Sequence, residues 1–299
     1  MIRRRLLALL AVVGCSGKPS PAPTAQFLDP EGKPVVLDSL PVSRIASTMQ
    51  SATEWIIALG ATDRLVARTD FDRQPEIAHL PSLGGGLEAS AEAVAALEPD
   101  VVLGWRIAAS VSLSRTLAPF GIPVIAVEAT DTAEAFSQLA AIGVLVGMED
   151  RAKQLADSIR AELAALTQQA CADGSRRESA MVVLWTDPPM TAGGPTWMTE
   201  LMDAACLDNI FSDLASPWPT VSMEAIAQRA PMWLITTDRG PEGARLDHYR
   251  ELPGWRDLAA VREGRVIELD GDLFARLGPT MADWVRAVIE GRRLVGRRD

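Results

Sequence analysis

The segment 132–172 constrains the fold of this chain more than any other, because it interrupts a regular alternation of strand and helix patterns. It carries no strand signal. Its second half has one apolar stripe at helical spacing, formed by Leu155, Ile159, Leu163 and Leu166. A helix over 149–170 would be roughly 33 Å long at 1.5 Å per residue. We therefore expect a long helix that reaches across a whole domain and joins two α/β units.

Short apolar runs alternate with helical patterns on both sides of this segment, which is typical of α/β lobes. The run Val101-Val102-Leu103 is apolar throughout, as in strands that are covered on both faces. Strands are expected at 44–48, 64–68, 100–105, 122–129, 180–185, 232–237 and 265–269. Helices are expected at 51–60, 90–97, 110–121, 196–205, 222–230 and 279–294.

One helix–strand unit occurs twice. "SAEAVAALEPDVVL" begins at Ser90 and "SMEAIAQRAPMWLI" begins at Ser222, and they share Ser, Glu, two Ala and Pro at the same offsets. The repeat indicates two related lobes with approximate two-fold symmetry. Chance similarity is the alternative, because Ser caps many helices and a glutamate such as Glu92 or Glu224 suits the positive end of the helix dipole.

The start of the chain is expected to be an export signal. A basic stretch precedes an apolar run from Leu6 to Val13, and Gly14 and Cys15 follow. The run is too short to span a bilayer, which needs about 20 apolar residues. We expect a lipoprotein signal peptide at 1–14 and a lipidated Cys15. An ordinary signal with an incidental cysteine is the alternative.

The remaining chain divides into four parts by composition and pattern. A Pro- and Ser-rich tether is expected at 15–40, an N-terminal α/β lobe at 41–130, an interlobe helical segment at 131–172 and a C-terminal α/β lobe at 173–299. The expected location is therefore outside the cytoplasm, in the periplasm or at the cell surface, with the body held near a membrane by its lipid anchor.

Cysteine content and charge add two further expectations. Cys171 and Cys206 remain in the body, and in an oxidising compartment they are able to pair, although the sequence leaves open whether they do. The formal net charge is −10. An acidic body without a clustered basic stripe does not suggest a nucleic-acid partner.

The usual sequence patterns of catalysis and metal binding are missing. There is no HExxH, CxxC or GxSxG pattern, and neither of the two histidines, His79 and His248, stands at metal-ligand spacing. The glycine run 84–86 lacks the Lys of a phosphate loop and is expected to be a turn. Tyr249 beside His248 is expected to form an exposed pair rather than a haem ligand set. We expect no enzyme activity and no resident metal or cofactor.

Tryptophan is overrepresented among the aromatic residues, since there are 8 Trp against 1 Tyr and 6 Phe. Trp105, Trp185 and Trp218 follow strands or lie in loops, where ligands of α/β sheets bind. Indole rings offer flat apolar faces to a large ligand. Asp272 and Arg276 lie four residues apart before the last helix and are either an ion pair or joint contacts to a polar ligand edge. Three other tryptophans are expected to pack in the core, namely Trp55, Trp233 and Trp284.

From about Ser43 to Val295 the chain resembles the cobalamin and iron-siderophore periplasmic binding proteins of ABC importers, of class III, and most closely their cobalamin-binding members. The stretches that carry the resemblance are "SATEWIIALG", "LEPDVVLGWR", "DPPMTAGG", "DNIFSD", "PWPTVSMEAI" and "GDLFARLGP". It implies an α/β fold of two Rossmann-like lobes joined by one long rigid helix. It also implies capture of a corrinoid between the lobes and delivery to an ABC permease dimer with its ATPase subunits.

The resemblance assigns roles to particular residues. It implies that Glu92 and Glu224 dock on arginines of the two permease subunits. It implies that Trp105 and Trp218 pack on the corrinoid, that Asp272 and Arg276 contact its polar edge, and that Met190 stands where an aromatic is usual.

The chain also departs from the cobalamin-binding pattern. Near residues 68–73, where the pattern has a tyrosine, "RTDFDR" offers Asp70 and Phe71, and Phe71 is the expected ligand contact of this stretch. Leu83 stands where a tryptophan is usual. These differences keep a ferric siderophore or haem open as the ligand. Two other classes of protein also stay open, an enzyme on a similar scaffold and a receptor that binds a metal ion directly.

Overall fold

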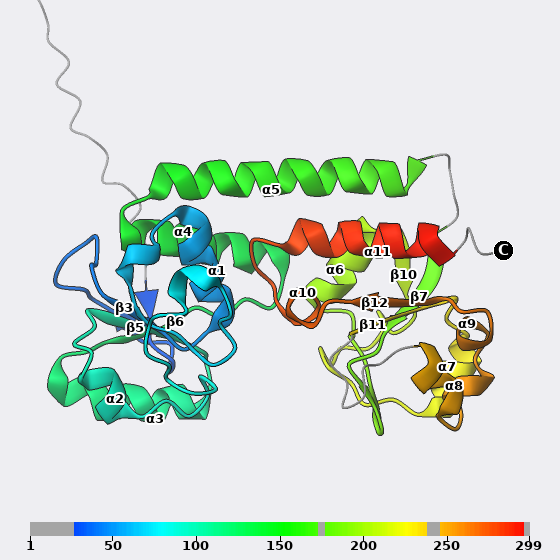
Figure 1. The fold of residues 1–299 in the computed structure, drawn as a ribbon, viewed down its shortest axis with the longest axis horizontal. Helices are drawn as coiled ribbons and strands as arrows, with labels where there is room; N and C mark the ends of the chain where they lie inside the picture. The colour runs from blue at the N-terminus through cyan, green and yellow to red at the C-terminus, as the bar shows by residue number, and fades with distance from the viewer. Residues whose placement is uncertain (1–26, 173–176, 238–245, 296–299) are drawn as a thin grey trace, which may run out of the picture.

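The computed structural model describes residues 27–172, 177–237 and 246–295. The expected signal peptide 1–14 and Cys15 lie outside the described residues. Figure 1 shows two α/β lobes side by side, with one long helix running along both of them. No helix in the described ranges is both long enough and apolar enough to cross a membrane.

The first lobe is built on a four-stranded parallel sheet in the order β4-β3-β5-β6. Its strands are β3 (Ile45–Ser47), β4 (Leu65–Ala67), β5 (Val101–Gly104) and β6 (Val124–Ala126). Its helices are α1 (Gln50–Leu59), α2 (Ala91–Ala95), α3 (Ala108–Leu117) and α4 (Thr132–Val146). A small hairpin of β1 (Phe27–Leu28) and β2 (Pro34–Val35) precedes the sheet, and β1 contacts β6.

The second lobe has its own four-stranded parallel sheet in the order β10-β7-β11-β12. Its strands are β7 (Glu178–Val182), β10 (Leu207–Asn209), β11 (Trp233–Thr237) and β12 (Val266–Leu269), and a hairpin is formed by β8 (Trp185–Thr186) and β9 (Pro189–Met190). Its helices are α6 (Trp197–Ala204), α7 (Met223–Arg229), α8 (Leu246–Glu251), α9 (Ala259–Arg262), α10 (Gly271–Ala275) and α11 (Met281–Val295). Short 3-10 turns in the two lobes are η1 (Thr62–Arg64), η2 (Pro75–Ile77), η3 (Ala118–Phe120) and η5 (Trp255–Asp257).

The two sheets have the same topology, because in each lobe the four strands taken in chain order have the spatial order 2-1-3-4. The repeated sequence unit occupies the same place in both, as α2 with β5 and as α7 with β11. The hydroxyl of Ser90 accepts from the backbone N–H of Ala93 at 3.2 Å, and that of Ser222 accepts from Ala225 at 3.1 Å. The repeat therefore reflects equivalent elements of two related lobes.

Backbone conformation strengthens this equivalence. Glu98 has φ of 44° and Ala230 has φ of 45°, and each stands immediately before the proline of its repeat. Left-handed backbone is uncommon outside glycine, and proline disfavours the right-handed helical conformation in the residue before it. Both repeats therefore end their helix with the same unusual turn into a buried strand.

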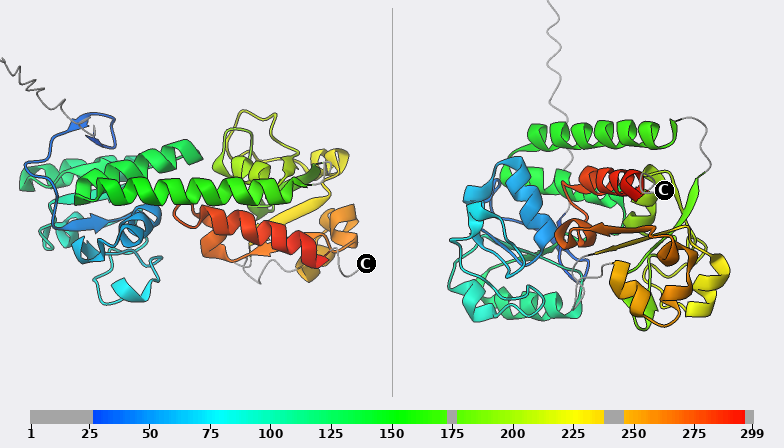
Figure 2. Two further views of the ribbon diagram at one scale, coloured as in Figure 1. Left: turned by 90° about the horizontal axis from the view of Figure 1, so that it is seen from above. Right: turned by 45° about the vertical axis from the view of Figure 1, so that its right-hand side comes forward.

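The expected interlobe helix is α5, which spans Glu149–Ala170. It contacts α1 and α4 of the first lobe and α6 and α11 of the second, as seen from above in Figure 2. It packs closely on α4 at Gly143, where an added Cβ would lie 2.6 Å from the Cβ of Ala152. The expected fold class, two α/β lobes joined by one long helix, is confirmed.

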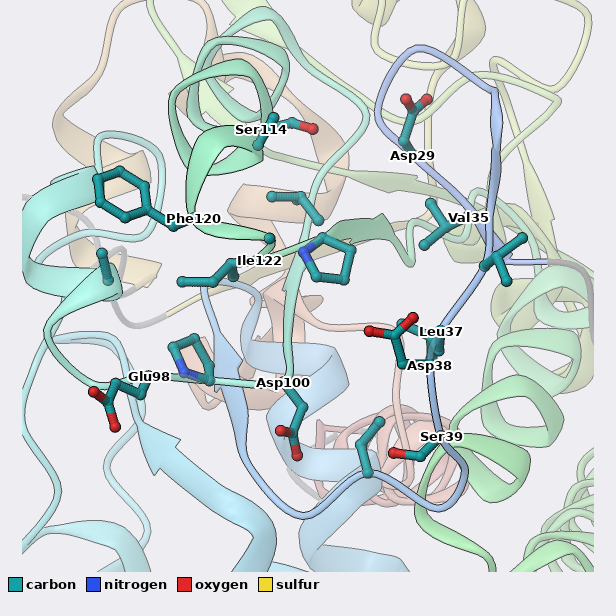
Figure 3. A pocket seen from close by; sticks show the side chains of 18 residues that line it. Asp29, Val35, Leu37, Asp38, Ser39, Glu98, Asp100, Ser114, Phe120 and Ile122 are labelled. Carbon is teal, nitrogen blue, oxygen red and sulfur yellow. The ribbon is translucent and has the colours of Figure 1, made fainter.

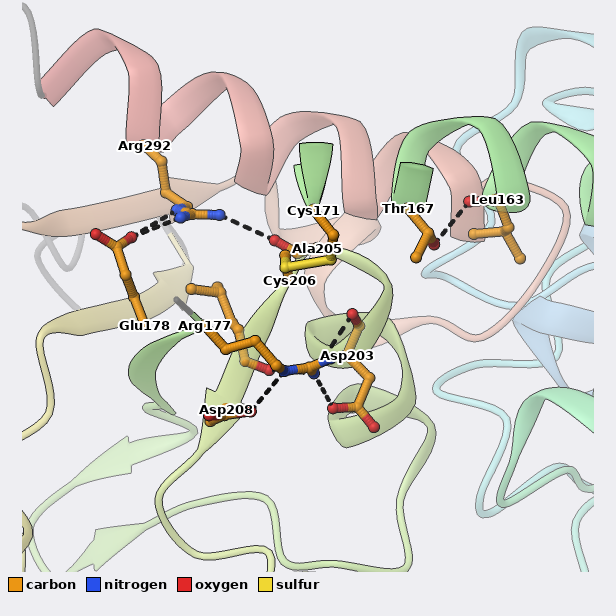
Figure 4. Close-up of a disulfide and its surroundings, with 11 residues drawn as sticks. Leu163, Thr167, Cys171, Arg177, Glu178, Asp203, Ala205, Cys206, Asp208 and Arg292 are labelled. Carbon is orange, nitrogen blue, oxygen red and sulfur yellow. Dashed lines mark hydrogen bonds and ion pairs between the residues drawn. A yellow bond between two sulfur atoms is a disulfide. The ribbon is translucent and has the colours of Figure 1, made fainter. Parts of the chain in front are cut away.

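A disulfide fixes the end of α5 to the second lobe, and it answers the question that the sequence left open. Cys171 caps α5, Cys206 lies between α6 and β10, and the two sulfurs are bonded (Figure 4). Beside the bridge, Arg177 pairs with Asp203 and Asp208, and the carboxylate of Glu178 accepts from Arg292. The disulfide thus ties the interlobe helix to the second lobe, while the ion pairs beside it hold α6, β7, β10 and α11 of that lobe together.

Replacing both Cys171 and Cys206 by Ser is expected to lower the free energy of unfolding by about 3–4 kcal/mol, because the bridge closes a loop of sequence separation 35 and restricts the unfolded chain. Urea denaturation of the oxidised wild type and the double variant measures the loss. Reduction of the wild type should reproduce it. Equal denaturation midpoints for the two proteins would contradict a stabilising bridge.

Tyr249 was predicted to be exposed, but it lies in the core. Tyr249 is fully buried, its hydroxyl lies 2.8 Å from the hydroxyl of Thr236, and its ring packs edge-on against Trp255 at 5.4 Å. Burial raises the pKa of Tyr249 to about 12. The expected exposed His–Tyr pair is therefore wrong, since α8 presents this ring to the core. Trp55, Trp233 and Trp284 are buried, as expected.

Candidate binding cleft between the lobes

A cavity of about 400 Å³ lies between the two lobes. Its size falls within the range of about 300–1,000 Å³ that is common for small-molecule sites. The first lobe lines it with residues that follow the carboxyl ends of β3, β5 and β6, namely Met49, Gln50, Ser51, Trp105, Glu128, Ala129 and Thr130. The second lobe contributes Pro195, Trp197, Pro217, Trp218, Ala275, Arg276 and Leu277.

Two of the expected aromatic residues meet in this cavity. Trp105 follows β5 and is partly buried, and Trp218 reaches the cavity from the second lobe with 40% of its surface exposed. The sequence reasoning missed a third, Trp197, which begins α6 and packs edge-on against Trp284 with ring centroids 6.5 Å apart. Trp197 is only 5% exposed and also packs in the core, so its sequence pattern is that of a core residue.

Trp185 and Met190 are not among the residues that line the cavity. They face each other across the β8–β9 hairpin, and the indole N–H of Trp185 donates to the backbone carbonyl of Asp187 at 2.9 Å. Met190 is bridged to Thr220. The hairpin therefore lies against the loop that carries Trp218, beside the cavity rather than within it.

Arg276 links the two lobes directly. Its guanidinium donates to Glu54 of α1 at 2.5 Å, to the backbone carbonyl of Phe71 at 2.9 Å and to Asp272 at 2.5 Å. The side chains of Arg276 and Glu54 are each only 11% exposed. The expected pair of Asp272 and Arg276 thus exists as an ion pair, and a partner from the other lobe, which the sequence reasoning missed, joins it.

Phe71 takes part in this link through its backbone carbonyl, and the residue as a whole is 47% exposed. The missed partner Glu54 had one sequence signal, because it is the single acidic residue in the apolar helix pattern at 51–60. Short α10, which places Asp272 and Arg276, begins where Asp270 accepts from the backbone N–H groups of Asp272 and Leu273.

The carboxyl of Glu54 is held in a crowded acidic environment. Its pKa is raised, chiefly because burial penalises the charged form, and the Arg276 guanidinium opposes this effect. Asp72 and Asp272 raise the pKa of Glu54 further by repulsion. Asp72 is itself 2% exposed and accepts from the backbone N–H and the hydroxyl of Thr69.

Glu92 and Glu224 lie elsewhere, in the first turns of α2 and α7, and both are exposed. Figure 1 shows these two helices on the side of the molecule opposite α5. The hydroxyl of Ser90 donates to the carboxylate of Glu92 at 2.7 Å and lowers the pKa of Glu92. Each lobe therefore presents one acidic side chain on the same side of the molecule.

A larger cavity, of about 700 Å³, lies at the amino ends of β5 and β6 (Figure 3). Ligands of open α/β sheets bind at the carboxyl ends of the strands, so this position does not favour a ligand site. Asp100 in its wall has a structural role, because its carboxylate accepts from the backbone N–H groups of Ser43 and Arg44 at 2.7 and 2.8 Å. The other acidic residues in its lining are Asp29, Asp38 and Glu98.

No group of three or more His, Cys, Asp or Glu side chains that could hold a metal ion occurs within 27–172, 177–237 and 246–295. In this part of the chain the cavity between the lobes is lined by three tryptophans, small polar and apolar side chains, one carboxylate, Glu128, and one ion-paired arginine. This lining is suited to packing and hydrogen bonding rather than to bond making.

A family model described as periplasmic binding protein matches residues 45–273 of the chain. The "Uncharacterized ABC transporter substrate-binding lipoprotein YvrC" of Bacillus subtilis is 28% identical over 299 residues, covering 95% of this chain and 94% of that protein. A "Vitamin B12-binding protein" of Pectobacterium carotovorum is 26% identical over 239 residues, covering 80% of this chain and 84% of that protein.

Solved structures with the same fold include proteins named for different ligands. A periplasmic heme-binding protein of Pseudomonas aeruginosa has a TM-score of 0.74 at 26% identity and covers 83% of this chain and 91% of its own. The periplasmic vitamin B12-binding protein of Vibrio cholerae has a TM-score of 0.70 at 22% identity and covers 86% and 99% of the two chains. At 22% identity, the likeness to the Vibrio cholerae protein shows the fold alone.

Proposed function

Because the chain belongs to the periplasmic binding protein family, we propose that it captures a corrinoid, cobalamin in the first instance, in the cleft between its lobes. It is a substrate-binding protein of an ABC transporter and not an enzyme. The transporter supplies its permease and ATPase partners. Its relatives and structural neighbours include proteins named for vitamin B12, for heme and for the transport of Fe3+-hydroxamate.

One observation carries the corrinoid proposal, namely that Trp105 and Trp218, from different lobes, line a single cavity together with the largely buried Trp197. A corrin ring is large and flat, and indole faces bury such a surface well. Arg276 at the edge of the same cavity provides N–H donors for the amide groups around the ring. Asp272 holds that arginine in place through their ion pair.

Haem or a ferric siderophore is the second candidate ligand. The heme-binding protein of Pseudomonas aeruginosa, at 26% identity, favours haem. Two departures from the cobalamin-binding pattern also support this alternative. Phe71 stands in the stretch where that pattern has a tyrosine, and Met190 lies outside the cavity lining.

Calorimetric titration of the purified protein against cyanocobalamin, cobinamide, haem and a set of ferric siderophores tests the proposal. We expect saturable heat with the corrinoids and a one-to-one stoichiometry, together with quenching of tryptophan fluorescence. Saturable binding of a siderophore or haem without binding of any corrinoid would replace the proposed ligand by the alternative.

Attachment and delivery complete the proposed function. Lipidation of Cys15 would hold the folded body at the membrane surface through the tether at 15–40. Glu92 and Glu224, one on each lobe and on the side opposite α5, suit a permease with two matching basic sites. The relative YvrC, named a lipoprotein, supports the anchor. Mass spectrometry of membrane-extracted protein tests the lipid anchor. Cys15 without a diacylglyceryl group would contradict it.

A further inference from the structure

The positive charge of Arg276 is matched by carboxylates before any ligand arrives. Its guanidinium contacts the carboxylates of Glu54 and Asp272, each at 2.5 Å. Glu54 comes from the first lobe and does not line the cavity, whereas Arg276 does. The charge of Arg276 is therefore compensated by the carboxylate of Glu54, which lies outside the cavity lining.

Glu54 lies close to two further carboxylates. Asp72 and Asp272 each raise the pKa of Glu54 by repulsion, while Arg276 lowers it through their ion pair. Buried oxygens of Glu54, Asp72 and Gln74 accept no hydrogen bond in the described structure. A further anion beside Glu54 would add to the repulsion that these carboxylates already exert on it.

The charged side chains of the cavity lining leave no positive charge unpaired. Among the described residues that line the cavity, Arg276 is the one basic side chain and Glu128 is the one acidic side chain. With Arg276 already paired, the wall offers no uncompensated positive charge from these residues. A neutral acceptor is still accommodated, because guanidinium carries five N–H donors and the three contacts to Glu54, Phe71 and Asp272 use three of them.

We infer that Glu54 determines the charge preference of the cleft, so that it accepts a ligand with a neutral amide edge and disfavours one with a carboxylate edge. The inference rests on the proposed function of ligand capture between the lobes. It separates the candidate ligands by their chemistry, because the corrin ring of cobalamin carries amides around its edge, whereas haem carries two propionates. Glu54 itself touches no ligand and acts through Arg276.

A matched pair of ligands tests the preference in the wild type. Cyanocobalamin and its monocarboxylic acid derivatives differ by the hydrolysis of one peripheral amide, so they share shape and apolar surface. We expect the wild-type protein to bind the neutral compound about tenfold more tightly than the derivative whose carboxylate faces Arg276. Equal or tighter binding of every monocarboxylic acid would overturn the inference.

The variant Glu54→Gln tests whether Glu54 is responsible. It keeps the shape of the side chain and an oxygen that accepts from Arg276, but it removes one negative charge. The monocarboxylic acid should bind about tenfold more tightly than to the wild type, while the affinity for cyanocobalamin changes little. Glu76→Gln, which removes an exposed charge from the same lobe, should leave both affinities unchanged. An unchanged ratio of the two affinities in Glu54→Gln would overturn the inference.

A measurement without ligand separates this inference from the proposed function. Denaturation of Glu54→Gln, Arg276→Gln and the double variant forms a mutant cycle, and we expect the double variant to lose less stability than the sum of the single losses. Additive losses would mean that Glu54 does not compensate Arg276. If the cycle shows coupling but no corrinoid binds, the proposed ligand fails and the charge compensation stands. Tight binding of haem in place of corrinoids would overturn both.

Discussion

A chain in which Glu92 and Glu224 are both replaced by Arg is expected to bind its ligand with wild-type affinity and to support no uptake. The two carboxylates lie in equivalent first turns, one on each lobe, and both are exposed. Reversal replaces two attractive contacts with two repulsive ones at the proposed permease surface, and like charges across an interface cost several kcal/mol. Neither residue lines the cavity, so binding should persist.

Uptake of labelled ligand by cells, together with titration of the purified variant, measures the two effects separately. A matched control is Asp150→Arg with Glu290→Arg, which makes the same change of charge on α5 and α11. Asp150 also lies in a first helical turn, so this control includes the cost of a basic residue beside the helix dipole. Uptake at the wild-type rate by the Glu92/Glu224 variant would contradict a docking role, and the repeated Ser-x-Glu would then serve only to begin the two helices.

Replacing Trp105 and Trp218 together by Ala is expected to weaken ligand binding roughly 1,000-fold, since each well-packed indole contributes about 2 kcal/mol. The two rings come from different lobes and meet in one cavity. Calorimetry with cyanocobalamin measures the loss. Both side chains are partly exposed, so the fold should tolerate the change.

Trp185→Ala provides the comparison, because this ring lies beside the cavity rather than in its lining and its indole N–H is already bonded within its own hairpin. We expect a much smaller loss of affinity from it. Trp218→Phe should keep part of the affinity that Trp218→Ala loses, because a flat ring remains. A loss from Trp185→Ala equal to that of the Trp105/Trp218 pair would place the ligand outside the cavity.

Several features of the fold were predictable because their causes are local in sequence. The apolar stripe with Ile159 and Leu166 depends only on the 3.6-residue period of a helix, and α5 has the bounds that this pattern predicted. The caps at Ser90 and Ser222 depend on backbone groups three residues away. The short β10 was missed, since it is only three residues long and Leu207 is its one apolar residue.

The candidate site was predictable only in part. Trp105 and Trp218 were found because side chains after parallel strands gather at one edge of a sheet. Trp197 was missed, since at the start of an amphipathic helix it has the pattern of a core residue. Tyr249 was placed wrongly because its neighbours in sequence, Asp247 and Arg250, are exposed while its own position on α8 faces the core.

The sequence by itself determined the two α/β lobes, their repeated helix–strand unit and the long helix between them, because periodicity and capping act over a few residues. Only the tertiary structure decided what the lobes bring together. Cys171 meets Cys206 across the end of α5, and Arg276 meets Glu54 over a separation of 222 residues. Such contacts depend on how α5 orients one lobe against the other, and that orientation is a sum of packing interactions that no local pattern records.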